Sequence, residues 1–111
     1  MGVHVSLVRV TQRGTSSKGR RVEYLASVGR SGDTFAGLCA RSELPMLRRV
    51  DPYNSQILTA RDMPQFISEL EATRAGSAGQ DVGVAGLLDD LLGLARRCAS
   101  QAGLEVHLDG D

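Results

Sequence analysis

The chain has 111 residues, which suits one domain spanning residues 1–111. Its formal net charge is zero and its hydrophobic and charged fractions are 41% and 23%, which excludes a disordered or uniformly basic protein. It has no apolar run near the roughly 20 residues that span a bilayer, and its start lacks signal-peptide features, so we expect a cytoplasmic protein with no membrane partner.

Charge is nevertheless distributed unevenly along the chain. The first 30 residues carry one acidic residue, Glu23, and six basic ones: Arg9, Arg13, Lys18, Arg20, Arg21 and Arg30. Residues 76–111 carry two arginines and six acidic residues: Asp81, Asp89, Asp90, Glu105, Asp109 and Asp111. This pattern indicates either a bipolar surface that steers a partner or two chain ends that neutralise each other within the fold.

The first elements form a hairpin. Residues 3–10 alternate apolar and polar side chains as a half-buried strand does, but the alternation slips at Leu7 and Val8. Such a slip arises from a β-bulge or from a strand that is buried on both faces. Residues 22–28 alternate in the same way and predict a second strand, with Val22 and Tyr24 in phase with Val28. Residues 12–20 between them predict a loop with a basic tip.

The middle of the chain is harder to interpret. Residues 34–47 have no clear period, so we expect short helical or irregular structure that buries Phe35, Leu38, Leu44 and Leu47. Residues 50–55 predict a turn because Pro52 fixes its φ angle and the neighbouring polar side chains can bond to the backbone. Residues 56–58 are expected to form a short extended segment.

Two helices follow. Thr59 and Asp62 have the spacing of a capping box, and the apolar residues of the following segment lie on one helical face, with Gln65 and Glu69 pointing away. We expect this helix to end near Arg74. Asp81 is expected to cap the second helix, whose apolar stripe continues to Cys98 and which Gly103 terminates.

Residues 104–108 alternate again and predict a last strand. The predicted fold class is therefore α+β, with a small antiparallel sheet made of the N-terminal hairpin and the C-terminal strand. Two helices are expected to cover one face of this sheet. Cys39 and Cys98 are expected to be reduced core residues, since two distant thiols do not make a disulfide framework.

Few residues predict a reaction centre. His4 and His107 would form a metal or acid–base site with Glu105 or Asp109 if the first and last strands paired, and would otherwise be surface residues. Asp89 and Asp90 diverge by about 100° on a helix, so they predict a solvated acidic face or an interface and not a matched catalytic pair. We expect no metal and no cofactor.

The second half of the chain resembles a known family. The segments that carry the resemblance are residues 44–53, which end in Asp51-Pro52-Tyr53, and residues 57–59, 63–70, 87–98 and 104–111. They resemble small bacterial immunity proteins, which bind a cognate toxin and block its active site. Asn54 stands where that family usually has Gly, and Asn tolerates the same turn. The resemblance implies an inhibitor with no catalytic residues.

These observations predict a non-enzymatic protein-binding module, an immunity protein whose partner is a cognate toxin. The predicted partner-binding residues are Asp89, Asp90, Glu105, Asp109, Arg20, Arg21 and Tyr53. Self-association into a homo-oligomer stays open. Two alternatives also stay open: a nucleic-acid-binding regulator that uses the basic hairpin, which the neutral net charge disfavours, and a small metal-dependent enzyme that uses His4 and His107.

Overall fold

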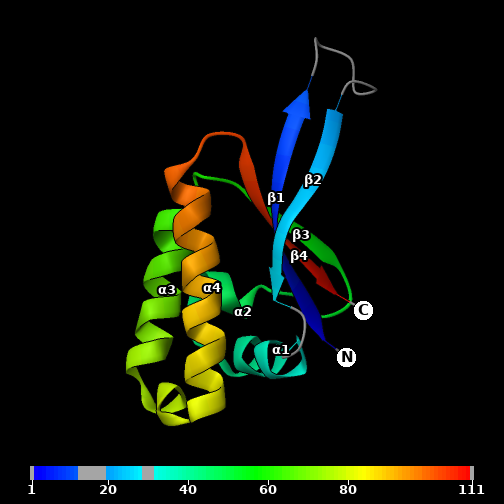
Figure 1. Ribbon diagram of the computed structural model, residues 1–111. Helices are drawn as coiled ribbons and strands as arrows, with labels where there is room; N and C mark the ends of the chain where they lie inside the picture. Colours follow the sequence, from blue (N-terminus) through cyan, green and yellow to red (C-terminus); the bar gives the residue numbers. More distant parts are fainter. Residues whose placement is uncertain (1, 13–19, 29–31, 111) are drawn as a thin grey trace.

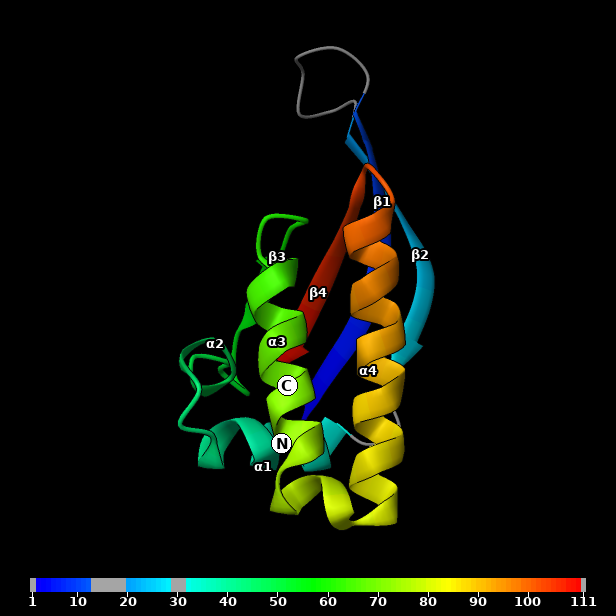
Figure 2. The same cartoon turned by 90° about the vertical axis from the view of Figure 1, so that its left-hand side faces the viewer.

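A four-stranded antiparallel sheet forms one layer of the molecule, and helices cover one of its faces (Figures 1 and 2). The structure, a computed structural model, describes residues 2–12, 20–28 and 32–110. Its elements are β1 (Val3–Gln12), β2 (Arg20–Val28), α1 (Gly32–Arg41), α2 (Pro45–Arg48), β3 (Ser55–Leu58), α3 (Met63–Ala75), the 3-10 turn η2 (Ser77–Gln80), α4 (Val82–Ser100) and β4 (Leu104–Gly110). The α+β prediction is confirmed.

The strand order is β2-β1-β4-β3, so the first and last strands lie side by side in the centre of the sheet. The extended segment expected at residues 56–58 is the edge strand β3, which pairs with β4. Alternate side chains point to opposite faces of a strand. Val5 and Leu108, which are paired, therefore face the helices and are 1% exposed, while the next pair, Ser6 and His107, faces the other way.

The irregular phase at Leu7 and Val8 arises because β1 is buried on both faces here, and the bulge at this point lies in the neighbouring strand. The β1–β2 register shifts at this point, because Leu7 pairs with Ala26 and Val8 with Tyr24, which leaves Leu25 as an extra residue in β2. The pairing of β1 with β4 is continuous, so the bulge lies in β2 and not in β1. Val8 points away from the helices but is fully buried, and Tyr24 and Glu105 flank it on the two adjacent strands.

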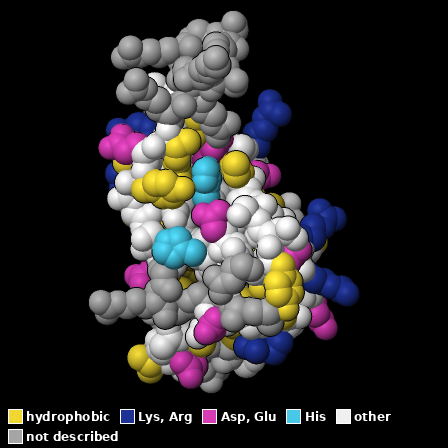
Figure 3. Space-filling model, turned by 90° about the vertical axis from the view of Figure 1, so that its right-hand side faces the viewer, with side chains coloured by type: hydrophobic (Ala, Val, Ile, Leu, Met, Phe, Trp, Pro, Cys, Tyr) yellow, Lys and Arg dark blue, Asp and Glu magenta, His cyan; other side chains and the backbone are white. Residues whose placement is uncertain are grey.

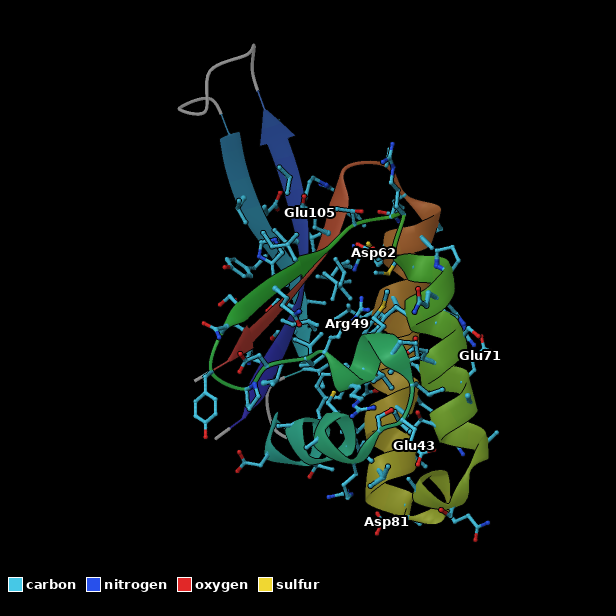
Figure 4. The ribbon with its side chains drawn as sticks, turned by 180° about the vertical axis from the view of Figure 1, so that it is seen from behind. Glu43, Arg49, Asp62, Glu71, Asp81 and Glu105 are labelled. Atoms are coloured by element: carbon cyan, nitrogen blue, oxygen red, sulfur yellow. The ribbon has the colours of Figure 1, made fainter. Side chains whose placement is uncertain are left out.

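The two long helices begin where polar side chains satisfy backbone N–H groups. Asp81 caps α4 by accepting a hydrogen bond from the N–H of Val84 at 3.1 Å, as predicted. Only half of the predicted capping box forms at α3: the Asp62 carboxylate accepts from the N–H of Thr59 at 2.8 Å, and the helix begins later, at Met63. Figure 4 shows Asp62 beside the start of α3 and Asp81 at the start of α4.

Glu69 of α3 does not point to solvent, contrary to the sequence prediction. It is 6% exposed, and its carboxylate accepts hydrogen bonds from the N–H groups of Met46 and Leu47 at the start of α2. The side chain of Gln65 donates a further hydrogen bond at 2.8 Å. Glu69 therefore joins α2 to α3, and this contact orders part of the segment for which the sequence pattern was unclear.

The core lies between the sheet and the helices. Phe35, Leu47, Phe66 and Leu91, from α1, α2, α3 and α4, all belong to one buried cluster with the inward side chains of the sheet. In Figure 1, helices α1 and α2 lie beside the lower halves of α3 and α4 and close this end of the core. Among the described residues, no helix has both the length and the apolar character needed to cross a bilayer.

Candidate functional site

The face of the sheet turned away from the helices is not covered by any other element in the described part of the chain. We call it the open face. Its side chains follow from the strand register and are His4, Ser6, Val8, Val10, Val22, Tyr24, Ser27, Ser55, Ile57, Glu105, His107 and Asp109. Figure 3 shows this side of the molecule, with the two histidines separated by a carboxylate and hydrophobic side chains beside the upper histidine.

His107 is held in place by its neighbours on this face. Its Nε2 atom lies 3.1 Å from a carboxylate oxygen of Glu105, and the ring of Tyr24 meets the imidazole edge to face, with ring centroids 6.5 Å apart. Glu105 and His107 are 19% and 12% exposed. Figure 4 shows Glu105 on β4, near the hairpin. Tyr24, Glu105 and His107 therefore form one contact cluster on the open face.

His4 and Asp109 are directly paired across β1 and β4. They border a hollow of about 410 Å³ that Ser6, Ser27 and Tyr24 also line. The hollow forms because the two serines are small and lie between larger side chains. The open face therefore has a shallow polar depression next to an aromatic ring.

The structure thus brings His4, His107, Glu105 and Asp109 to one face, as the pairing of the first and last strands requires. They do not converge on one point: His107 bonds to Glu105, while His4 lies opposite Asp109. No group of three His, Cys, Asp or Glu side chains in the described ranges is arranged to hold a metal ion.

The open face also exposes large apolar side chains. Tyr24, Ile57 and Val22 are 65%, 51% and 44% exposed. The sequence pattern placed Val22 and Tyr24 in phase with Val28, but the bulge at Leu25 turns them to the open face while Val28 faces the helices. Neither Tyr24 nor Ile57 was predicted as a site residue. For Ile57 the available signal was a large apolar residue at an outward position of a short strand.

The Asp-Pro-Tyr turn borders the open face where β3 begins. The carboxylate of Asp51 accepts hydrogen bonds from the N–H of Tyr53 at 2.8 Å and from the side chain of Asn54 at 2.6 Å. These two bonds lower the pKa of Asp51 below its usual value. Asp51 and Asn54 therefore shape the turn, whereas the side chain of Tyr53 is 63% exposed and available for contact.

The predicted acidic surface is divided between two layers. Glu105 and Asp109 lie on the open face, but Asp89 and Asp90 lie on α4, behind the sheet. Asp89 forms an ion pair with Arg74 at 3.1 Å. Arg20 and Arg21 belong to β2 by their backbone pairing, and their side chains fall outside the described part of the structure, as do residues Arg13 and Lys18 as a whole.

Both thiols are buried, on α1 and α4. Burial raises the pKa of Cys39 to about 12. The pKa of Cys98 is also raised, first by burial and then by the negative charges of Glu105 and Asp62. Both side chains are therefore protonated at neutral pH, and a protonated thiol is a poor nucleophile.

Comparisons of this chain with protein-family models, with curated proteins and with solved structures gave no match.

Proposed function

We propose that this protein is a binding module that contacts another protein through its open face, and that the partner is a bacterial toxin which it neutralises. The observation that carries the proposal is the group of exposed apolar side chains on the face of the sheet that none of the described helices covers. Of five large hydrophobic residues that are exposed in the described structure, Tyr24, Ile57 and Val22 lie on this face and Tyr53 borders it.

The composition of the open face supports a protein partner. Protein interfaces are enriched in aromatic anchors surrounded by polar groups. Here Tyr24 projects from a strand that pairs only with β1 among the described strands, and the polar side chains of His4 and Asp109 lie beside it. The anchors sit on strands that are hydrogen-bonded within the sheet, which fixes their positions before binding and so reduces the entropy lost on association.

A toxin partner is proposed from the resemblance to immunity proteins over residues 44–111. Ile57, Glu105, Asp109 and Tyr53 of the open face and its border come from that part of the chain. Small immunity proteins often present acidic surface to basic nuclease sites. Glu105 and Asp109 supply that charge on the open face, so we expect Asp89 and Asp90 to contribute less than these two.

The test has two steps. The tagged protein is used to capture its partner from the native host, and the captured protein is then expressed alone to determine whether it arrests growth. The proposal expects a growth-arresting partner and rescue by coexpression of the wild-type chain. Replacing Tyr24 and Ile57 together with Ala is expected to weaken binding by about tenfold or more per residue and to abolish rescue.

Val82→Ala is the matched control, because Val82 is a large apolar residue that is 88% exposed but lies at the start of α4, on the helical layer. It is expected to bind and rescue as the wild type does. Two results would contradict the proposal: a partner whose expression is harmless to the cell, or loss of binding with Val82→Ala but not with the double variant.

A further inference from the structure

A groove of about 1090 Å³ runs between α4 and β2, along the β2 edge of the sheet. Ala26 and Val28 line it from the strand, and Gly86, Asp90, Gly93 and Arg97 line it from the helix. A Cβ atom added to Gly86 or Gly93 would have nothing within 4 Å, so the helix surface is bare at these two positions. The groove therefore admits another backbone close to α4.

The charges of α4 differ between its two sides. Toward α3, Asp89 pairs with Arg74 at 3.1 Å and Arg96 pairs with Glu71 at 3.7 Å. Toward the groove, Asp90 and Arg97 are both exposed, and neither has an ion pair or side-chain hydrogen bond within the described residues. A spacing of seven residues places them on the same face of the helix.

Asp90 and Arg97 are placed symmetrically about Gly93 and Leu94. If a second copy of α4 packs antiparallel against the first with its twofold axis at this point, each Asp90 lies opposite Arg97 of the other copy. The contact then contains two identical ion pairs, and Gly93 lies at the centre, where the helices approach most closely. A surface that is complementary to itself in this way is what a twofold interface requires.

The free edge of β2, on the other wall of the groove, is compatible with the same twofold axis. β2 is an edge strand, since β1 is its only neighbour among the described strands, so backbone N–H and C=O groups line its free side. It runs antiparallel to α4, as Figure 1 shows. An axis perpendicular to the sheet brings two β2 edges together in antiparallel orientation while it brings the two α4 helices together.

We propose that the groove between α4 and β2 is the interface of a homodimer, with a second copy of this chain as its occupant. Three features support this interface: the charges of Asp90 and Arg97, which are unpaired within the described residues, the bare helix surface at Gly86 and Gly93, and the free edge of β2. β2 contributes to both surfaces, but the charged and bare positions of this groove lie on α4 and the apolar side chains of the open face do not, so variants of one surface test it separately from the other.

The test is a charge exchange, measured by sedimentation velocity on the full chain over a range of concentrations. Wild-type protein is expected to dimerise. Asp90→Arg and Arg97→Asp each turn two attractions into two repulsions and are expected to weaken the dimer on the order of tenfold or more. The double variant Asp90→Arg/Arg97→Asp restores opposite charges across the axis and is expected to dimerise nearly as the wild type does.

Two further variants test whether the contact at Gly93 and the location of the charge matter for dimerisation. Gly93→Gln adds a side chain at the point of closest approach and is expected to yield monomers, while circular dichroism shows an intact fold because Gln favours helix over Gly. Arg61→Asp reverses an exposed charge outside the groove and is expected to leave the dimer unchanged. A wild-type chain that is monomeric throughout, a dimer that persists in both single reversals, or a double variant that stays dissociated would each overturn the proposal.

Discussion

Glu69 is a single residue that fixes the relation between two helices. The residue is 6% exposed, and its carboxylate accepts hydrogen bonds from Met46, Leu47 and Gln65. A carboxylate at the start of a helix satisfies N–H groups that have no partner within the helix. The short helix α2 has no capping side chain of its own, so Glu69 supplies from α3 what the local sequence lacks.

We expect Glu69→Ala to destabilise the protein by about 3 kcal/mol, because two N–H groups of α2 lose a charged acceptor in a buried environment. Glu69→Gln keeps one acceptor oxygen and is expected to cost about half as much. The measurement is urea unfolding followed by circular dichroism. Glu71→Ala is the control, since Glu71 is exposed on the same helix; equal losses for Glu69→Ala and Glu71→Ala would contradict the role of Glu69.

Glu69 also shows a limit of sequence reasoning at this scale. On α3 it occupies a position that the helical pattern assigns to solvent, and the pattern cannot distinguish an exposed carboxylate from one that a second helix covers. The burial depends on α2, which contacts α3 from 22 residues earlier in the chain. Asp81 was predictable because its partner, Val84, is three residues away.

At the scale of elements, the turn between α3 and α4 depends on one small residue. A Cβ atom added to Gly79 of η2 would lie 1.8 Å from the backbone oxygen of Arg74, near the end of α3. Any larger residue therefore forces the turn away from α3. The same test on α4 gives the opposite result, because Gly86 has open space around it.

Two glycine substitutions are therefore expected to act in opposite directions. Gly79→Ala is expected to destabilise the protein by about 2 kcal/mol or more, since a rigid backbone atom blocks the added carbon. Gly86→Ala is expected to stabilise it by about 1 kcal/mol, because Ala favours helix and the site is free. Thermal unfolding at low protein concentration measures both changes. A stable Gly79→Ala variant would show that the turn relaxes without cost.

Elements with strong local signals were predicted and those ordered by distant contacts were not. The sequence of α4 carries its own cap and apolar stripe, so its extent was predicted within a few residues. α1 has only Phe35, Leu38 and Cys39 as buried apolar residues, too few for a clear period, and its position depends on the core that it closes. The open-face residues Val22 and Tyr24 were misplaced because one bulge in β2 reverses the alternation before it.

At the scale of the whole molecule, the sheet joins distant parts of the chain. β1 and β4 form the central pair, with Val3 opposite Gly110. Most of the sequence therefore separates two strands that are adjacent in the folded sheet. Folds with many contacts between distant residues fold slowly, because the chain loses loop entropy before those contacts form.

We expect refolding from urea on the order of milliseconds to seconds, as for other small sheets with distant pairings. Stopped-flow fluorescence of Tyr24, which packs beside His107 of β4 only in the folded sheet, provides the measurement. Tyr53→Phe serves as the control, because Tyr53 is exposed in a local turn and its removal simplifies the signal without changing the rate. Refolding in microseconds would contradict this account.

The central place of β4 also matters while the protein is being synthesised. Until residues 104–110 leave the ribosome, β1 and β3 each lack the strand that lies between them in the finished sheet. The nascent chain therefore emerges with the apolar sides of Val5, Leu7 and Leu58 uncovered, which is the kind of surface that chaperones bind. Slow codons placed before this last strand would lengthen that exposed period, so aggregation during expression should respond to translation speed.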